Sequence, residues 1–108
     1  MPFAVHLTGD AARDLEDICD YIERRDSPAS AAHVLDRIEE AFAGLSEHPL
    51  RGGFPKELLD IGIREYREVF FKPYRIIYRV LDENVYVLVI ADGRRDMRTL
   101  LEQRLLLA

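Results

Sequence analysis

The residues best suited to do chemistry are arginines in the second half of the chain. Arg75 and Arg79 lie four residues apart in a strand-like run, and Arg94 and Arg95 follow the apolar run Val85–Ala91. A guanidinium is planar and always charged, and it can donate two parallel hydrogen bonds to a carboxylate or a phosphate. These arginines therefore suit either an acidic partner chain or the phosphates of a nucleic acid.

The other reactive side chains form no recognisable site. His6, His33 and His48 are separated by 27 and 15 residues and have no carboxylate at a metal-ligand spacing. Cys19 is the only cysteine and falls on the apolar stripe of a predicted helix, so we expect a small buried hydrophobic residue. The chain lacks a glycine-rich phosphate loop and a Gly-x-Ser-x-Gly motif. We expect neither a metal nor a cofactor.

The charge is divided unevenly along the chain. Residues 1–50 carry 4 basic and 11 acidic side chains, whereas residues 51–108 carry 11 basic and 9 acidic ones, and the net charge is -5. Phosphate binding needs a positive surface, so the acidic half disfavours non-specific binding to nucleic acid. Any nucleic-acid site has to be local.

The length of 108 residues, 48% of them hydrophobic, predicts one domain over 1–108 with its own core. The longest apolar run, Val85–Ala91, is far below the roughly 20 residues that span a bilayer. The first six residues also lack the basic start of a signal peptide. We expect a soluble cytoplasmic protein with no membrane contact.

Two helices are predicted in the first half of the chain. After a short strand, Phe3–Leu7, Thr8 stands where an N-cap is needed, and apolar residues follow at helical spacing over 9–25. Ser27, followed by a proline, starts a second helix over 28–47. Because only two or three residues join the helices, they form an antiparallel hairpin.

The second half predicts three strands and a last helix. The strands are joined by two- or three-residue turns, which force antiparallel neighbours. Asp96 stands where it can cap the last helix. The expected elements are a helical turn at 56–60, strands at about 66–71, 74–81 and 85–91, and a helix at 97–107.

The element order β-α-α-β-β-β-α predicts an α+β domain. We expect the helical hairpin to pack on one face of a small, mainly antiparallel, four-stranded sheet. In the strand over 74–81, Tyr78 and its alternate neighbours face the hairpin, whereas Arg75 and Arg79 face the other way. We expect that second face to be open and to form a groove with the arginines after the last strand.

The last helix carries more leucines than one stripe on a small sheet can bury. An exposed apolar patch on a monomer usually marks a partner site. We predict that Leu101 and Leu105 dock the helix on the sheet, whereas Leu106 and Leu107 point towards a partner chain.

Several segments resemble one known family. The run Tyr74–Val80, an acidic turn, Val85–Ile90 and Gly93–Asp96 closely resemble the C-terminal half of the RelE/ParE toxin superfamily of bacterial type II toxin-antitoxin modules. The stretch Leu7–Ile22 looks like the opening strand and first helix of the same superfamily. The resemblance covers nearly the whole chain, in order.

The resemblance implies a toxin that a cognate antitoxin protein neutralises, and it leaves the target open. ParE-like members poison DNA gyrase, and RelE-like members cleave messenger RNA on the ribosome without a metal. Our leading hypothesis is a ParE-like toxin that acts on a protein target such as gyrase and has no catalysis of its own. The alternatives are a ribosome-dependent endoribonuclease with Arg75 and Arg95 at the phosphate, and a degenerate relative that only binds an antitoxin.

Departures from the RelE-like pattern favour the ParE branch. Leu101 stands at the position of the last-helix tyrosine of the nucleases, and Asp92 stands where many relatives have histidine. Where a strand should bring paired lysines, Arg67 lies between Glu65 and Glu68. Without a group that titrates near neutral pH, in-line attack by a ribose hydroxyl loses about 10²-fold or more.

The resemblance and the strand pattern together give the expected binding residues for the antitoxin or the target: Arg67, Arg75, Arg79, Arg94, Arg95, Leu106 and Leu107. A structural interpretation of the segment after the last strand also stands, in which Asp96 caps the helix and an arginine pairs with Asp92. The expected assembly is a homodimer or a toxin-antitoxin hetero-oligomer.

Overall fold

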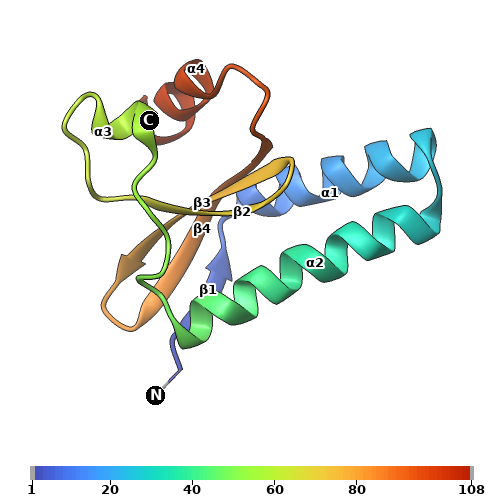
Figure 1. Ribbon diagram of the computed structural model, residues 1–108, viewed down its shortest axis with the longest axis horizontal. Coiled ribbons are helices and arrows are strands. Elements are labelled where there is room, and N and C mark those ends of the chain that lie inside the picture. Colours follow the sequence, from blue (N-terminus) through green and yellow to red (C-terminus); the bar gives the residue numbers. More distant parts are fainter. Residues whose placement is uncertain (1, 108) are drawn as a thin grey trace.

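The computed structural model describes residues 2–107, and their elements follow the predicted order (Figure 1). The first half holds β1 (Ala4–Leu7), α1 (Gly9–Arg25) and α2 (Pro28–Glu47). The second half holds α3 (Lys56–Leu59), β2 (Arg67–Phe71), β3 (Tyr74–Leu81), β4 (Asn84–Asp92), α4 (Met97–Leu101) and a π-helical turn, η1 (Glu102–Leu106).

The four strands form one sheet in the order β1-β4-β3-β2, which confirms the predicted fold class. Two-residue turns make β2, β3 and β4 antiparallel neighbours. β1 runs parallel to β4, with Val5 opposite Val85. A parallel pair is possible there because most of the chain lies between the two strands and serves as the crossover.

Both long helices have the predicted bounds because their starts are capped as the sequence indicates. The Thr8 hydroxyl accepts a hydrogen bond from the Ala11 amide (3.2 Å), and the Ser27 hydroxyl accepts one from the Ser30 amide (3.0 Å). Each bond satisfies an amide that has no partner inside its helix.

The helical hairpin covers one face of the sheet, and its far end extends past the sheet edge (Figure 1). Ala11, Ile38 and Leu45 are fully buried against strand residues that include Ile76 and Tyr78. These side chains are the predicted apolar stripes of the two helices and the predicted covered face of β3.

The second face of the sheet is not open, and the prediction of an open groove is wrong. The short helices α3 and α4 lie across this face and bury Leu58, Met97 and Leu101 against Ile77 and Val89. The alternation of Ile77 and Val89 with the residues of the first face already requires a second cover, because exposed apolar side chains of this size cost free energy. A helix of one turn, such as α3, has too few residues to show a period.

The last helix is shorter than predicted, because α4 ends at Leu101 and the chain continues as η1. Leu101 is fully buried and Leu105 packs on the same cluster. Leu106 and Leu107 are 39% and 68% exposed. The docking of Leu101 and Leu105 and the exposure of Leu106 and Leu107 are therefore confirmed, and the contact of the exposed pair with a partner chain stays a prediction.

Cys19 is half-buried on α1 rather than fully buried. Burial, together with the nearby carboxylates of Asp20 and Glu23, raises the pKa of its thiol. The thiolate is the reactive form, so this environment is that of a structural cysteine. No helix within residues 2–107 is long and apolar enough to cross a membrane.

Candidate functional site

Arg75 lies in a buried ion network, which corrects its expected place on an exposed groove. Its Nε donates to Oε1 of Glu68 (2.7 Å), and its Nη1 and Nη2 donate to the two carboxylate oxygens of Glu57 (2.9 and 2.7 Å). Arg75 and Glu68 are each only 8% exposed. Each of the three guanidinium nitrogens therefore already donates to a carboxylate.

Three elements build this network. Arg75 on β3 stands opposite Phe70 on β2, so Glu68 is its diagonal neighbour on the second face of the sheet. α3 crosses that face and supplies Glu57. Gly93 leaves room for the arginine stem, because a Cβ there would lie 2.9 Å from Cδ of Arg75.

The network changes the pKa of both carboxyl groups, in opposite directions. The hydrogen bonds from Arg75 lower the pKa of Glu57 to about 2. Burial raises the pKa of Glu68, and its bond to Arg75 offsets that effect only in part. The pKa of Arg75 is raised, chiefly by Glu57, so the guanidinium remains charged.

Arg67 holds the loop before α3 against the start of β2. Its Nη1 donates to the carbonyl oxygen of Gly52 (2.8 Å), and its guanidinium lies 4.6 Å from the centre of the Phe54 ring. The Tyr78 hydroxyl accepts a hydrogen bond from the Gly52 amide on the same loop (3.0 Å). A side chain at position 52 would meet the Glu68 carbonyl oxygen at 2.4 Å, so the close approach requires glycine.

Arg79 lies at the other end of β3 and is partly exposed. Its Nη2 is 3.6 Å from a carboxylate oxygen of Glu65, and its guanidinium lies 5.9 Å from the centre of the Tyr66 ring. A contact of this length between exposed groups constrains the side chain little.

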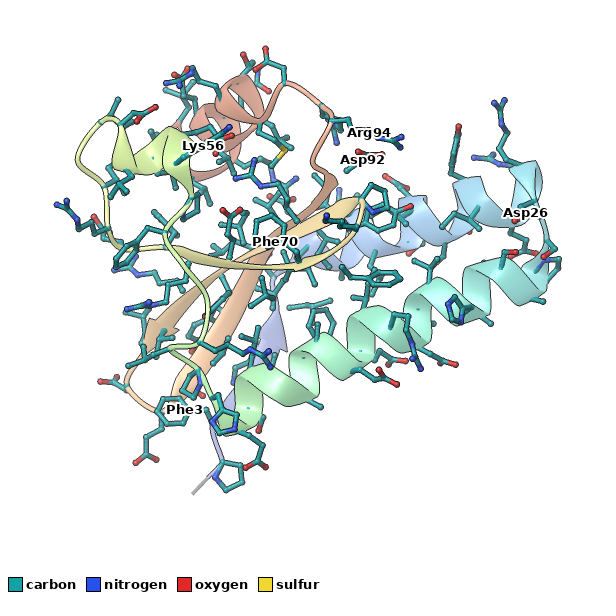
Figure 2. All side chains as sticks on the ribbon, in the orientation of Figure 1. Phe3, Asp26, Lys56, Phe70, Asp92 and Arg94 are labelled. Carbon is teal, nitrogen blue, oxygen red and sulfur yellow. The ribbon has the colours of Figure 1, made fainter. Side chains whose placement is uncertain are left out.

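Arg94 and Asp96 make the contacts that the structural interpretation of the segment after β4 predicts. Arg94 donates from Nε and Nη2 to the Asp92 carboxylate, with a shortest distance of 2.6 Å, and Figure 2 shows the two side chains together. Asp96 accepts from the Thr99 amide (3.2 Å) and caps α4. The Arg95 side chain is exposed.

Arg94 and Arg95 also line a cleft of about 450 Å³ between α1 and the ends of β3 and β4. Asp17 and Tyr21 form the helix side of this cleft, and Tyr21 is 55% exposed. The cleft carries both signs of charge next to an exposed aromatic ring, as a protein interface does.

The structure thus divides the predicted arginine groove among three places. Arg75 is buried under α3, Arg67 and Arg79 lie where β2 begins and β3 ends, and Arg94 and Arg95 lie beyond the opposite end of β3. Eight residues of extended chain span about 25 Å, so the two ends of β3 cannot serve one small ligand.

A further ion pair was not predicted. Arg104 on η1 donates two hydrogen bonds of 3.0 Å to the Asp14 carboxylate on α1 and one of 2.8 Å to the carbonyl oxygen of Leu88. Asp14 also accepts from the Ile90 amide (3.0 Å). β1 ends at Leu7, and these two side chains take over the hydrogen bonds of the β4 edge beyond it. The one signal in the sequence is an arginine among leucines near its end.

Two positions at which the sequence departs from the RelE-like pattern are Leu101 and Asp92. Leu101 is an apolar core residue. Arg94 lowers the pKa of Asp92 from its ordinary value of 3.8, and so moves it further from neutrality. Burial raises the pKa of Tyr74, which lines the same cleft. Residues 2–107 contain no cluster of three or more histidine, cysteine, aspartate or glutamate side chains that suits a metal ion.

Three solved structures have a similar fold. The chromosomal ParDE TA system from P. aeruginosa has a TM-score of 0.69 at 21% identity, over 83% of this chain and 95% of that one. The RelBE2 toxin-antitoxin complex from Mycobacterium tuberculosis has a TM-score of 0.54 at 28% identity, over 85% and 99%. A mutant of E. coli RelE in the free state has a TM-score of 0.59 at 12% identity, over 92% of each chain.

Sequence comparisons match this chain to one family of proteins, which the similar folds alone do not do. Residues 5–97 match the family described as ParE toxin of type II toxin-antitoxin system, parDE. Toxin ParE3 of Caulobacter vibrioides is 33% identical over 91 residues, which cover 84% of this chain and 83% of that protein. With this match over most of its length, the chain belongs to the ParE toxin family of type II toxin-antitoxin systems.

Proposed function

We propose that this toxin is neutralised by a cognate antitoxin and acts by binding a protein target, DNA gyrase by analogy with the ParE branch, without catalysis of its own. The observation that carries the proposal is the burial of Arg75 between two carboxylates. The alternative of a ribosome-dependent ribonuclease requires this guanidinium at the scissile phosphate.

A phosphate cannot replace the present partners of Arg75 at low cost. Glu57 and Glu68 occupy its Nε, Nη1 and Nη2. If Arg75 moved to a phosphate, both carboxylates would lose their cation in a buried place, which is strongly unfavourable. If the phosphate moved in instead, it would lie beside two carboxylates and be repelled.

Proton transfer gives a second reason against ribonuclease chemistry. Among the residues around Arg95, the pKa of Asp92 is lowered by Arg94 and the pKa of Tyr74 is raised by burial, so both lie further from neutrality than usual. A general acid or base works best when its pKa is near the working pH. A toxin that binds a protein target needs neither group.

The antitoxin part of the proposal rests on the neighbours and on exposed surface. Two of the similar structures are described as a ParDE toxin-antitoxin system and a RelBE2 toxin-antitoxin complex. On this chain, the cleft beside Arg94 and Arg95 and the exposed Leu106 and Leu107 are surfaces for such a partner. The expected binding set therefore keeps these residues together with Arg67 and Arg79, whereas Arg75 supports the fold.

The proposal is tested by expressing the chain in bacteria with and without the protein encoded by the adjacent reading frame. Expression alone should stop growth, with induction of the DNA-damage response and filamentation, while pulse-labelled protein synthesis continues. Purified toxin should inhibit DNA supercoiling by purified gyrase, and co-expression of the adjacent protein should restore growth. Arrest with prompt loss of protein synthesis would contradict the proposal, and no arrest by the folded chain would indicate a degenerate antitoxin-binding relative.

A further inference from the structure

A second cleft, of about 300 Å³, lies where β3 runs into the turn to β4. This turn is at the end of the sheet far from the tip of the helical hairpin (Figure 1). It is formed by the loop before α3, the segment that leads into β2, and the last residues of β3. Its lining residues are Leu50, Arg64, Glu65, Arg67, Arg79, Val80 and Leu81.

The charge of this cleft is opposite to that of the whole chain. Arg64, Arg67 and Arg79 line it with Glu65 as the single carboxylate, although the chain has a net charge of -5. Arg64 is exposed, and within residues 2–107 its side chain makes no hydrogen bond or ion pair. A positive site on an acidic protein selects and steers an acidic partner.

Three apolar side chains line the cleft beside the charged ones. Leu50 is 63% exposed and Leu81 is 44% exposed. Val80 is partly buried and packs against the core. Both leucines keep apolar surface in contact with water, so an apolar side chain placed between them would gain burial on both sides.

The backbone at the end of β3 has an unpaired edge. β2 begins at Arg67, which stands opposite Tyr78, so the last three residues of β3 have no strand on that side. Leu81 pairs with Asn84 at the turn, and alternation along the strand therefore directs the amide and carbonyl of Val80 away from β4. Within residues 2–107 no backbone group outside the strands hydrogen-bonds Val80.

We infer that this cleft binds an extended acidic segment of the antitoxin, with carboxylates on Arg64 and Arg79 and an apolar side chain between Leu50 and Leu81. The inference rests on the proposed function and adds to it the place and chemistry of one contact. An extended peptide fits because it also pairs with the free Val80 backbone groups.

A nucleic acid fits this cleft less well. Single strands are held by stacking of bases on aromatic rings as well as by arginines. Of the two rings nearby, Tyr66 is buried, and Phe54 is covered by the guanidinium of Arg67. The cleft offers cations and leucines but no free aromatic face.

The test compares three probes by fluorescence anisotropy: an octapeptide of alternating glutamate and leucine, its lysine-leucine counterpart, and a single-stranded RNA octamer. The glutamate peptide should bind best, and Arg64→Glu or Leu81→Ser should weaken it by about tenfold or more. Arg24→Glu is the matched control, because it makes the same charge change on exposed α1 and should alter binding by less than about twofold. Thermal melting checks that each variant is folded, and Arg64→Gln replaces Arg64→Glu if that variant melts early.

The same variants are then measured against the antitoxin purified with this chain from its own operon. Weaker antitoxin binding by the Arg64 and Leu81 variants, with Arg24→Glu unchanged, supports the inference. Equal antitoxin binding by all variants overturns the cleft contact. Binding of the RNA probe that depends on Arg64, without binding of the glutamate peptide, also overturns it. Both outcomes leave the toxin proposal intact. Failure of the proposed function looks different, because the wild-type chain itself then neither arrests growth nor binds an antitoxin.

Discussion

Arg75 and Arg79 lie four residues apart on β3, and their surroundings are opposite. Arg75 is buried and donates to Glu57 and Glu68 at 2.7 to 2.9 Å, whereas Arg79 is partly exposed and reaches one carboxylate at 3.6 Å. The difference comes from α3, which covers the sheet over Arg75 and leaves the end of β3 free. Two arginines with the same sequence context thus have different roles, one in the fold and one on the surface.

Replacement of Arg75 should give the largest effect. Arg75→Ala leaves two carboxylates buried without a cation, and we expect the free energy of unfolding to fall by about 3 to 5 kcal/mol. Urea denaturation at neutral pH measures the change. A triple variant, Arg75→Met with Glu57→Gln and Glu68→Gln, also removes the two buried negative charges, and it should be more stable than Arg75→Ala. If Arg75→Ala alone is as stable as the wild type, the network is not buried in solution.

Truncation of a leucine at each end of the last helical segment should change the stability of the fold by very different amounts. Leu101→Ala opens a cavity in the core under α4, and we expect a loss of about 2 to 5 kcal/mol. Leu107 is 68% exposed, so Leu107→Ala should change stability by no more than about 0.5 kcal/mol. Thermal melting of both variants is sufficient, and equal losses would show that the whole segment is packed.

The pH dependence of stability should depend on Glu57. Its folded pKa of about 2 lies below the ordinary value of 4.5, so it stabilises the fold above pH 4.5, and this contribution is lost as the pH falls towards 2. Glu68 acts in the opposite direction, because its raised pKa favours the protonated folded form. The wild type should therefore lose about 1 to 3 kcal/mol more than Glu57→Gln between pH 5 and pH 3. Urea titrations at fixed pH measure the two slopes, and parallel slopes would argue against the Glu57–Arg75 contact.

Replacement of Arg79 should have the smallest effect on the fold. Arg79→Ala removes one long, partly exposed contact, and we expect a change within about 0.5 kcal/mol. The same urea denaturation compares its free energy of unfolding with that of Arg75→Ala. A loss as large as that of Arg75→Ala would remove the distinction between the two arginines.

Local signals made most of the fold predictable. Thr8 and Ser27 mark the helix starts, and alternation with short turns marks β2, β3 and β4, because these signals lie within a few residues of what they determine. The cover that α3 gives to the second face was not predicted, since α3 is a single turn and its packing is a long-range event.

The candidate site was predicted less well for the same reason. Arg75 stands out by its residue type and its place in a strand, but its partner Glu57 lies 18 residues away on a helix of a single turn. Arg104 and Asp14 are 90 residues apart, and no spacing rule connects them. Residue type indicates what an arginine can bind, and only the tertiary fold decides whether a carboxylate of the same chain already binds it.

The most direct test of the account is messenger RNA cleavage in a purified translation system. We add the toxin to translating ribosomes and map cleavage by primer extension, with inhibition of gyrase by the same preparation as the control for activity. The buried Arg75 network predicts intact messenger RNA and continued translation at toxin concentrations that inhibit gyrase. Prompt cleavage in the ribosomal A site that is lost in an Arg95→Ala variant would contradict the account and identify the chain as a ribonuclease.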